Sequence, residues 1–208
     1  MDIHKPKAAH SWRDFAIEIG TIVCGIVIAL ALEQAVESAR MASEVREARQ
    51  ALQREIAANA LGSVFAIQVN ECIIPQVAAY VVWAKGGPKP PTFRAELNGY
   101  ESSTWESVKT GAVTQMPLEE RLALASFYDL LAANQKVIEY QRPPAFVLLG
   151  ASERQALSQE DAGRVLDAAA TMQVGAYFNR ANTKRLLHEA FDMGIPPPPL
   201  SASMRRRM

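Results

Sequence analysis

Few side chains in this chain could carry out chemistry, and their spacing is not that of a catalytic site. There are three histidines. His4 and His10 precede a long apolar segment, so a metal site or a Ser-His-Asp arrangement would depend on His188 alone. We interpret His188 as a surface or capping residue. Glu119 and Glu120 are consecutive, so on a helix they point about 100° apart, and they suit the positive end of a helix dipole.

The segment from residue 103 to residue 128 holds the strongest candidate for a binding site. Trp105 and Tyr128 could floor a pocket with Lys109 or Arg121 at its rim. The alternative, which we favour, is that this segment packs into a helical core. The core would then contain Trp105, Val108, Met116, Leu122 and Tyr128.

Several function classes have no signature in the chain. It contains no phosphate-binding GxxxxGK[ST], no dinucleotide-binding GxGxxG and no G-x-S-x-G nucleophile elbow. We therefore predict no catalytic residues, no cofactor and no enzymatic activity. Lys+Arg and Asp+Glu both number 22, so we expect no nucleic-acid partner. Cys24 lies within the N-terminal apolar segment and Cys72 in the soluble part of the chain, so we expect no disulfide between them. We expect Cys72 to be buried as a small hydrophobic residue.

An almost unbroken apolar run, residues 15–32, lies near the N-terminus. As a helix it would reach roughly 27 Å, against a bilayer hydrocarbon core of about 30 Å. Basic residues precede the run and Glu33 and Glu37 follow it. The positive-inside rule then predicts that residues 1–14 are cytoplasmic and that the rest of the chain lies outside the membrane. Two alternatives are a cleaved signal peptide and a buried core helix of a soluble protein.

The lipid bilayer is the first expected partner of this helix. One face of the helix could also contact a protein partner within the bilayer. Glu18, Thr21, Gly25 and Ala29 fall on one side at helical spacing. Small residues let two helices approach closely, so we consider self-association, or contact with another membrane protein, through this face. The alternative is that Glu18 simply reaches the cytoplasmic interface.

The rest of the chain predicts an all-α fold, in which the transmembrane helix continues into an antiparallel helical bundle. Residues 33–194 would form the extracytoplasmic domain and residues 195–208 a disordered, proline-rich and basic tail. We expect Pro75 to kink or split a helix over 33–85, and Pro143 and Pro144 to end one that begins at Pro117. Capping residues predict two further helix starts, Ser103 with Glu106 and Ser158 with Asp161. The predicted apolar positions of the last two helices are Leu124, Phe127, Leu131, Ile138, Val165, Ala169, Met172, Ala176 and Leu187.

The N-terminal sequence resembles that of a family of uncharacterised bacterial single-pass inner-membrane proteins. The lead HKPKAAHSWRDF matches their HKPxxxHxWR[DE]F pattern, and a short glycine-containing apolar helix ending in EQAVE follows it. The segment from Trp105 through Gly111 to Tyr128 is also similar. The resemblance implies an inner-membrane anchor and a helical soluble domain, and it implies no activity.

We therefore expect a membrane-anchored helical protein that acts as a binding or interaction module outside the bacterial inner membrane. The alternatives are a membrane-bound enzyme with an atypical site and a soluble helical protein whose first helix is buried.

Overall fold

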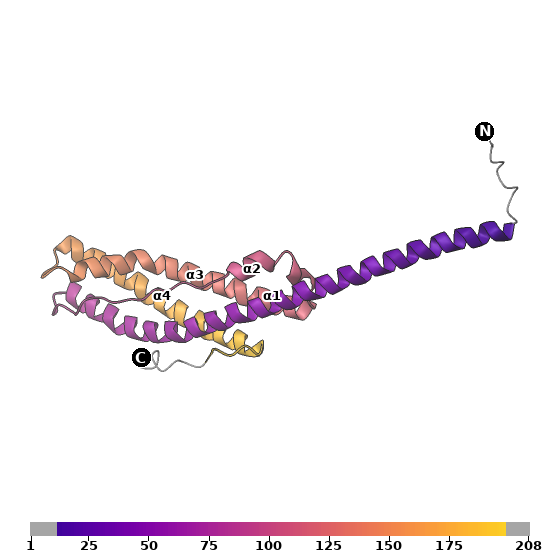
Figure 1. Ribbon diagram of the computed structural model, residues 1–208. Coiled ribbons are helices and arrows are strands. Elements are labelled where there is room, and N and C mark those ends of the chain that lie inside the picture. Colours follow the sequence, from indigo (N-terminus) through magenta and orange to yellow (C-terminus); the bar gives the residue numbers. More distant parts are fainter. Residues whose placement is uncertain (1–11, 199–208) are drawn as a thin grey trace, which may run out of the picture. The chain divides into compact units, whose positions relative to one another are not determined.

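The computed structural model describes residues 12–198, and this part of the chain is all-α, which confirms the predicted fold class. The predicted roles of the residues before Trp12, and of most of the C-terminal tail, fall outside the described residues. In chain order the elements are α1 (Trp12–Ala84), α2 (Ser103–Val108), the short 3-10 helix η1 (Ala112–Gln115), α3 (Leu118–Ser152) and α4 (Gln159–Asp192) (Figure 1).

The chain divides into two compact units, Met1–Glu47 and Ala48–Met208. In the first unit, the described residues form the N-terminal part of α1. The second unit contains the later part of α1 and all the other elements. We refer to it as the helical domain.

The core of the helical domain lies where α1, α3 and α4 meet. One apolar cluster contains Val77 and Trp83 of α1, Leu148 of α3, and Val165 and Met172 of α4. Burial of large apolar side chains stabilises such a core by about 1.5–3 kcal/mol each. Every predicted apolar position of α3 and α4 is buried except Leu187, whose neighbour Leu186 is buried in its place.

The contacts also give the directions of the helices. Near the start of the domain Arg49 of α1 binds Glu120 of α3, and further along Ile73 and Leu148 share the core, so these two helices run the same way. Helix α4 runs opposite to both, since Glu189 near its end contacts Ser126 near the start of α3, and Val165 near its start shares the core with Leu148 near the end of α3. A parallel pair of helices requires a connection that returns along their whole length. Residues 87–102, which we call the strap, make the first part of this return in extended form, and α2 and η1 complete it (Figure 1).

Three prolines lie inside helices. The expected helix end at Pro143 and Pro144 is wrong, and Pro75 does not split α1, whereas a kink at Pro75 stays a prediction. Helix α1 continues through Pro75, and α3 continues through Pro143 and Pro144 to Ser152. Each proline removes one backbone donor. The carbonyl left without a donor by Pro75 belongs to Glu71, which is exposed, so water can bind it. Buried side chains on both sides of each proline hold the helix against the core and offset the lost bond.

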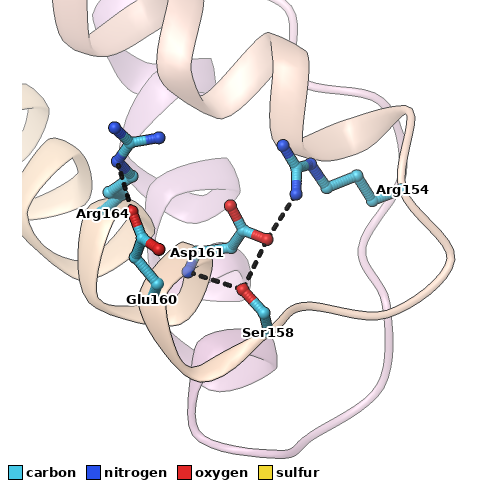
Figure 2. Close-up of polar contacts among 5 residues, drawn as sticks. All are labelled: Arg154, Ser158, Glu160, Asp161 and Arg164. Carbon is cyan, nitrogen blue, oxygen red and sulfur yellow. Dashed lines mark hydrogen bonds and ion pairs between the residues drawn. The ribbon is translucent and has the colours of Figure 1, made fainter.

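The start of α4 agrees with the predicted cap. Ser158 accepts a hydrogen bond from the Asp161 backbone N–H, with 3.1 Å between nitrogen and Oγ, and its hydroxyl donates to Asp161 Oδ2 at 2.7 Å. Figure 2 shows Asp161 between Ser158 and Arg154, with the neighbouring pair Glu160–Arg164. The Ser158 hydrogen bond, together with the positive charge of Arg154, lowers the pKa of Asp161.

A close approach of α3 and α4 depends on Gly175. A Cβ atom at this position would lie 2.5 Å from Cγ of Gln141, a fully buried side chain of α3. The absence of a side chain at Gly175 therefore lets Gln141 occupy the space between the two helices.

We expect Gly175→Ala to destabilise the domain by about 1–3 kcal/mol, because the added methyl overpacks the contact with Gln141. Chemical denaturation of the full-length protein in detergent measures the change. Gly163→Ala is the matched control on the same helix, since no atom lies within 4 Å of its added Cβ. That variant should be neutral or more stable. Equal behaviour of the two variants would contradict the close-packing account.

Candidate functional site

The described part of the N-terminal unit is an apolar helix that no other described residue covers. An 18-residue window of α1 near the N-terminus has a mean hydropathy of 2.5, and 0% of it is buried. The predicted contact face lies within this part of the chain. Thr21 donates its hydroxyl hydrogen to the Ile17 carbonyl at 2.9 Å, and Gly25 leaves open space around its Cα. A neighbouring helix could therefore approach closely at Gly25. The contact face itself stays a prediction.

In the helical domain, Trp105 and Tyr128 lie together as a stacked pair. Their ring centroids are 4.7 Å apart and the rings are inclined by 6°. Tyr128 is buried and Trp105 is half-buried. Stacked faces at this distance leave no space for a ligand between them, so the pair closes one side of the core.

A carboxylate that we did not single out from the sequence lies behind this pair. Glu55 of α1 is 6% exposed. Its Oε1 accepts hydrogen bonds from the Tyr128 hydroxyl at 2.7 Å and from the Trp105 backbone N–H at 3.2 Å. Its Oε2 accepts from the Thr104 N–H at 2.7 Å and from the Ser103 hydroxyl at 3.4 Å. A buried charge needs such donors to offset its lost hydration.

This arrangement replaces the cap that we predicted for α2. The Ser103–Glu106 capping box is wrong, because the N-cap residue is Ser102 and it makes no side-chain cap bond. The free N–H groups at the start of α2 bind the carboxylate of Glu55 instead. A negative charge at a helix N-terminus is favourable, so Glu55 joins α2 to α1.

The same contact affects Tyr128. Burial, together with the hydrogen bond to the Glu55 carboxylate, raises the pKa of Tyr128 well above its ordinary value. Tyr128 therefore stays a neutral hydrogen-bond donor throughout the physiological pH range.

The two predicted rim residues bind local partners. Lys109 pairs with Glu106, one turn earlier in the chain, with 2.5 Å between Nζ and Oε2. Arg121 donates to the Thr114 carbonyl at 3.4 Å. Leu122, which we expected in the core, is 60% exposed, whereas Met116 is buried.

A second set of α1 side chains holds the strap. The Asn59 amide donates to the Glu101 carbonyl at 2.7 Å and accepts from its N–H at 3.0 Å. The Gln76 amide makes the same pair of bonds with the backbone of Arg94, at 3.0 Å and 2.8 Å. An amide side chain can thus substitute for the neighbouring strand that an extended backbone lacks.

The tyrosine Tyr80 adds a third attachment. Its hydroxyl donates to the Pro91 carbonyl at 3.1 Å and accepts from the Phe93 N–H at 2.9 Å. Glu55, Asn59, Gln76 and Tyr80 therefore form a polar column along α1 that binds the strap and the start of α2.

At the middle of the domain a buried polar network joins all three long helices to the strap. Asn70 of α1 donates to Asn179 of α4 at 3.0 Å, and Thr183 donates to the same Asn179 oxygen at 3.0 Å. Asn134 of α3 donates to Thr183 at 3.2 Å and to the Tyr100 hydroxyl of the strap at 3.0 Å. These contacts orient each helix about its own axis.

The remaining candidates do not form a reactive centre within the described part of the chain. His188 is exposed and lies 3.5 Å from Asp192, in agreement with a surface role. Cys72 is exposed, so the expectation of burial is wrong: it lies on the side of α1 that faces the strap. Among residues 12–198, no three His, Cys, Asp or Glu side chains gather into a group that could hold a metal ion.

Comparison of the chain with protein-family models, with curated proteins and with solved structures gives no match.

We expect Glu55→Gln to destabilise the helical domain by about 2–3 kcal/mol, because an amide has one acceptor oxygen where the carboxylate has two. Denaturant titration of the full-length protein in detergent, followed by tryptophan fluorescence, measures the loss. Glu106→Gln is the matched control, because among residues 12–198 that exposed side chain binds only Lys109, and we expect a change below about 0.5 kcal/mol. A Glu55→Gln variant as stable as this control would show that the carboxylate is dispensable.

Proposed function

We propose that this protein is a non-enzymatic binding or interaction module held outside the bacterial inner membrane by residues 15–32. The single observation that carries the proposal is the apolar window of α1, which is long enough to cross a bilayer and has no protein cover in the structure. Its exposed side chains include Ile22, Ile26 and Leu30. Exposing such a surface to water is unfavourable, and lipid would cover it.

Two observations bear on the alternatives. The window is 0% buried, which argues against a soluble protein whose first helix lies in the core. Helix α1 runs on from the apolar segment to Ala84 without a break, which argues against a signal peptide that is cleaved near Ala31.

The polar interior of the helical domain supports a binding role over catalysis. The buried carboxylate, Glu55, has hydrogen-bond donors on both oxygens, and these bonds join α1 to α2 and α3. Asn59 and Gln76 are likewise bound to backbone groups of the strap. These side chains hold the fold in place, which leaves the membrane segment and the domain surface to meet partners.

A reporter at the C-terminus tests the location and the orientation together. We expect the full-length fusion to be recovered with the membrane fraction. Alkaline phosphatase, which is active only outside the cytoplasm, should be active when fused at this position. A reporter that fluoresces only in the cytoplasm should show no fluorescence there. Replacing Lys5, Lys7 and Arg13 with Glu should reduce phosphatase activity, since it removes the positive charges that orient the helix. Recovery of the intact fusion in the soluble fraction would overturn the proposal.

Within this proposal, we expect the small-residue face to mediate self-association in the membrane. Gly25→Leu should weaken dimerisation at least tenfold in an intramembrane two-hybrid assay, because leucine separates the two backbones. Gly20→Leu is the matched control, since Gly20 lies on the opposite side of the helix from Glu18. Unchanged association of Gly25→Leu would exclude this face as the contact.

A further inference from the structure

A cavity of about 1060 Å³ lies between α1 and the strap, near the polar network. Its walls include Gly62 and Asn70 of α1, Arg94 and residues 96–100 of the strap, and Asn179 of α4. The two attachments of the strap to α1, at Arg94 and at Glu101, lie at its ends. Between these attachments the strap leaves the helix uncovered, and this is where the space opens.

The strap has unpaired backbone groups beside this cavity. The N–H of Arg94 binds Gln76, and the N–H of Tyr100 binds Gln135. Between them, the backbone groups of residues 95–99 make no hydrogen bond with any part of the chain that the structure describes. An extended backbone with free N–H and C=O groups is a template for amides of a second chain or ligand.

Two buried side chains also present free polar atoms. Asn70 is 2% exposed and Asn179 is 3% exposed, and both line the cavity. The Asn70 amide nitrogen donates to the Ala66 carbonyl at 2.7 Å, which fixes the orientation of that amide. It also donates to Asn179 Oδ1. Asn70 Oδ1 and Asn179 Nδ2 are thus left without a partner among residues 12–198, as one acceptor and one donor.

The charges around the cavity balance. Glu71 lies 3.6 Å from Arg180, and the strap contributes Arg94 and Glu96. Apolar surface is present as well, from Phe65, Val69 and Leu97. A site of this kind has no net charge to attract an ion, and it suits a neutral molecule with a small apolar part.

We propose that this cavity binds a small neutral ligand that carries one or more secondary amides. The carbonyl of such an amide would accept from Asn179 Nδ2, and its N–H would donate to Asn70 Oδ1. Further amides or hydroxyls would pair with the backbone of residues 96–99. Short peptides and N-acetylated sugars share this chemistry. The inference deepens the proposed binding role, and it does not depend on where the protein resides.

Isothermal titration calorimetry of the purified full-length protein in detergent tests the site by measuring the heat of binding. Two probes distinguish the sources of the amide: N-acetyl-dialaninamide for a peptide and N-acetylglucosamine for a sugar. Glucose is the control ligand without an amide. We expect saturable binding of at least one amide probe and at least tenfold weaker binding of glucose.

Variants locate the binding. Gly62→Leu should weaken binding of the amide probe at least tenfold, because the leucine side chain would enter the cavity. Gly62 lines the cavity, and no described atom lies within 4 Å of a Cβ added there. Gly163→Leu on α4, where the space is also open, should leave binding unchanged. Asn179→Asp keeps the oxygens that accept from Asn70 and Thr183 but loses the free donor, so it should also weaken binding.

The exposed thiol of Cys72, which lines the cavity, supplies a second measurement. In a Cys24→Ser background, a saturating amide probe should slow alkylation of Cys72, and Gly62→Leu should abolish this protection. Absence of saturable binding by both amide probes would overturn the inference, as would equal binding of the probe to wild type and Gly62→Leu. The reporter assay of membrane insertion is unaffected by either result, so failure of the site and failure of the anchor are distinguishable.

Discussion

The helical domain depends on satisfying the hydrogen bonds of an extended chain that lies against a helix. Because α1 and α3 run in the same direction, the chain must return along the whole domain between them, and it does so as the strap followed by α2 and η1. A helix uses its own backbone groups internally, so it offers none to a neighbouring extended segment. The side chains of the polar column of α1 supply these hydrogen bonds instead. Asn59 and Gln76 each bind both the N–H and the C=O of one strap residue, Glu101 and Arg94 respectively.

This solution favours a unique structure over a maximally apolar core. Buried amides and carboxylates stabilise a protein only when their partners are in place, so a shift of the strap by one residue would leave several of them unpaired. Glu55 shows the principle most clearly. Its carboxylate accepts from Thr104 and Trp105, which fixes the start of α2, and from Tyr128, which fixes α3 beside it. Trp105 and Tyr128, which both bind this carboxylate, also stack their rings against each other.

The helices could be read from the sequence, but the polar contacts between distant segments could not. Apolar periodicity placed most of the core, and the local cap at Ser158 is confirmed, because helical spacing and capping involve residues close in the chain. The bonds from Glu55 reach a backbone 49 residues away, at Thr104, and no local pattern specifies that partner. One signal was present: Glu55 and Asn59 lie among the buried Leu52 and Ile56, so polar residues interrupt an apolar face. The helix end expected at Pro143 and Pro144 failed for the opposite reason, since tertiary packing overrode a local preference.

The geometry of the two strap attachments explains why the intervening backbone stays unpaired. From Asn59 to Gln76, α1 rises roughly 26 Å. The strap residues that these side chains bind, Glu101 and Arg94, can be at most roughly 25 Å apart when the chain is fully extended. The strap therefore crosses this interval almost taut, and its residues cannot fold back to pair with one another. Because the attachments are set by buried side chains of a rigid helix, the free amides of residues 95–99 are held in place before any ligand arrives, which lowers the entropy lost on binding.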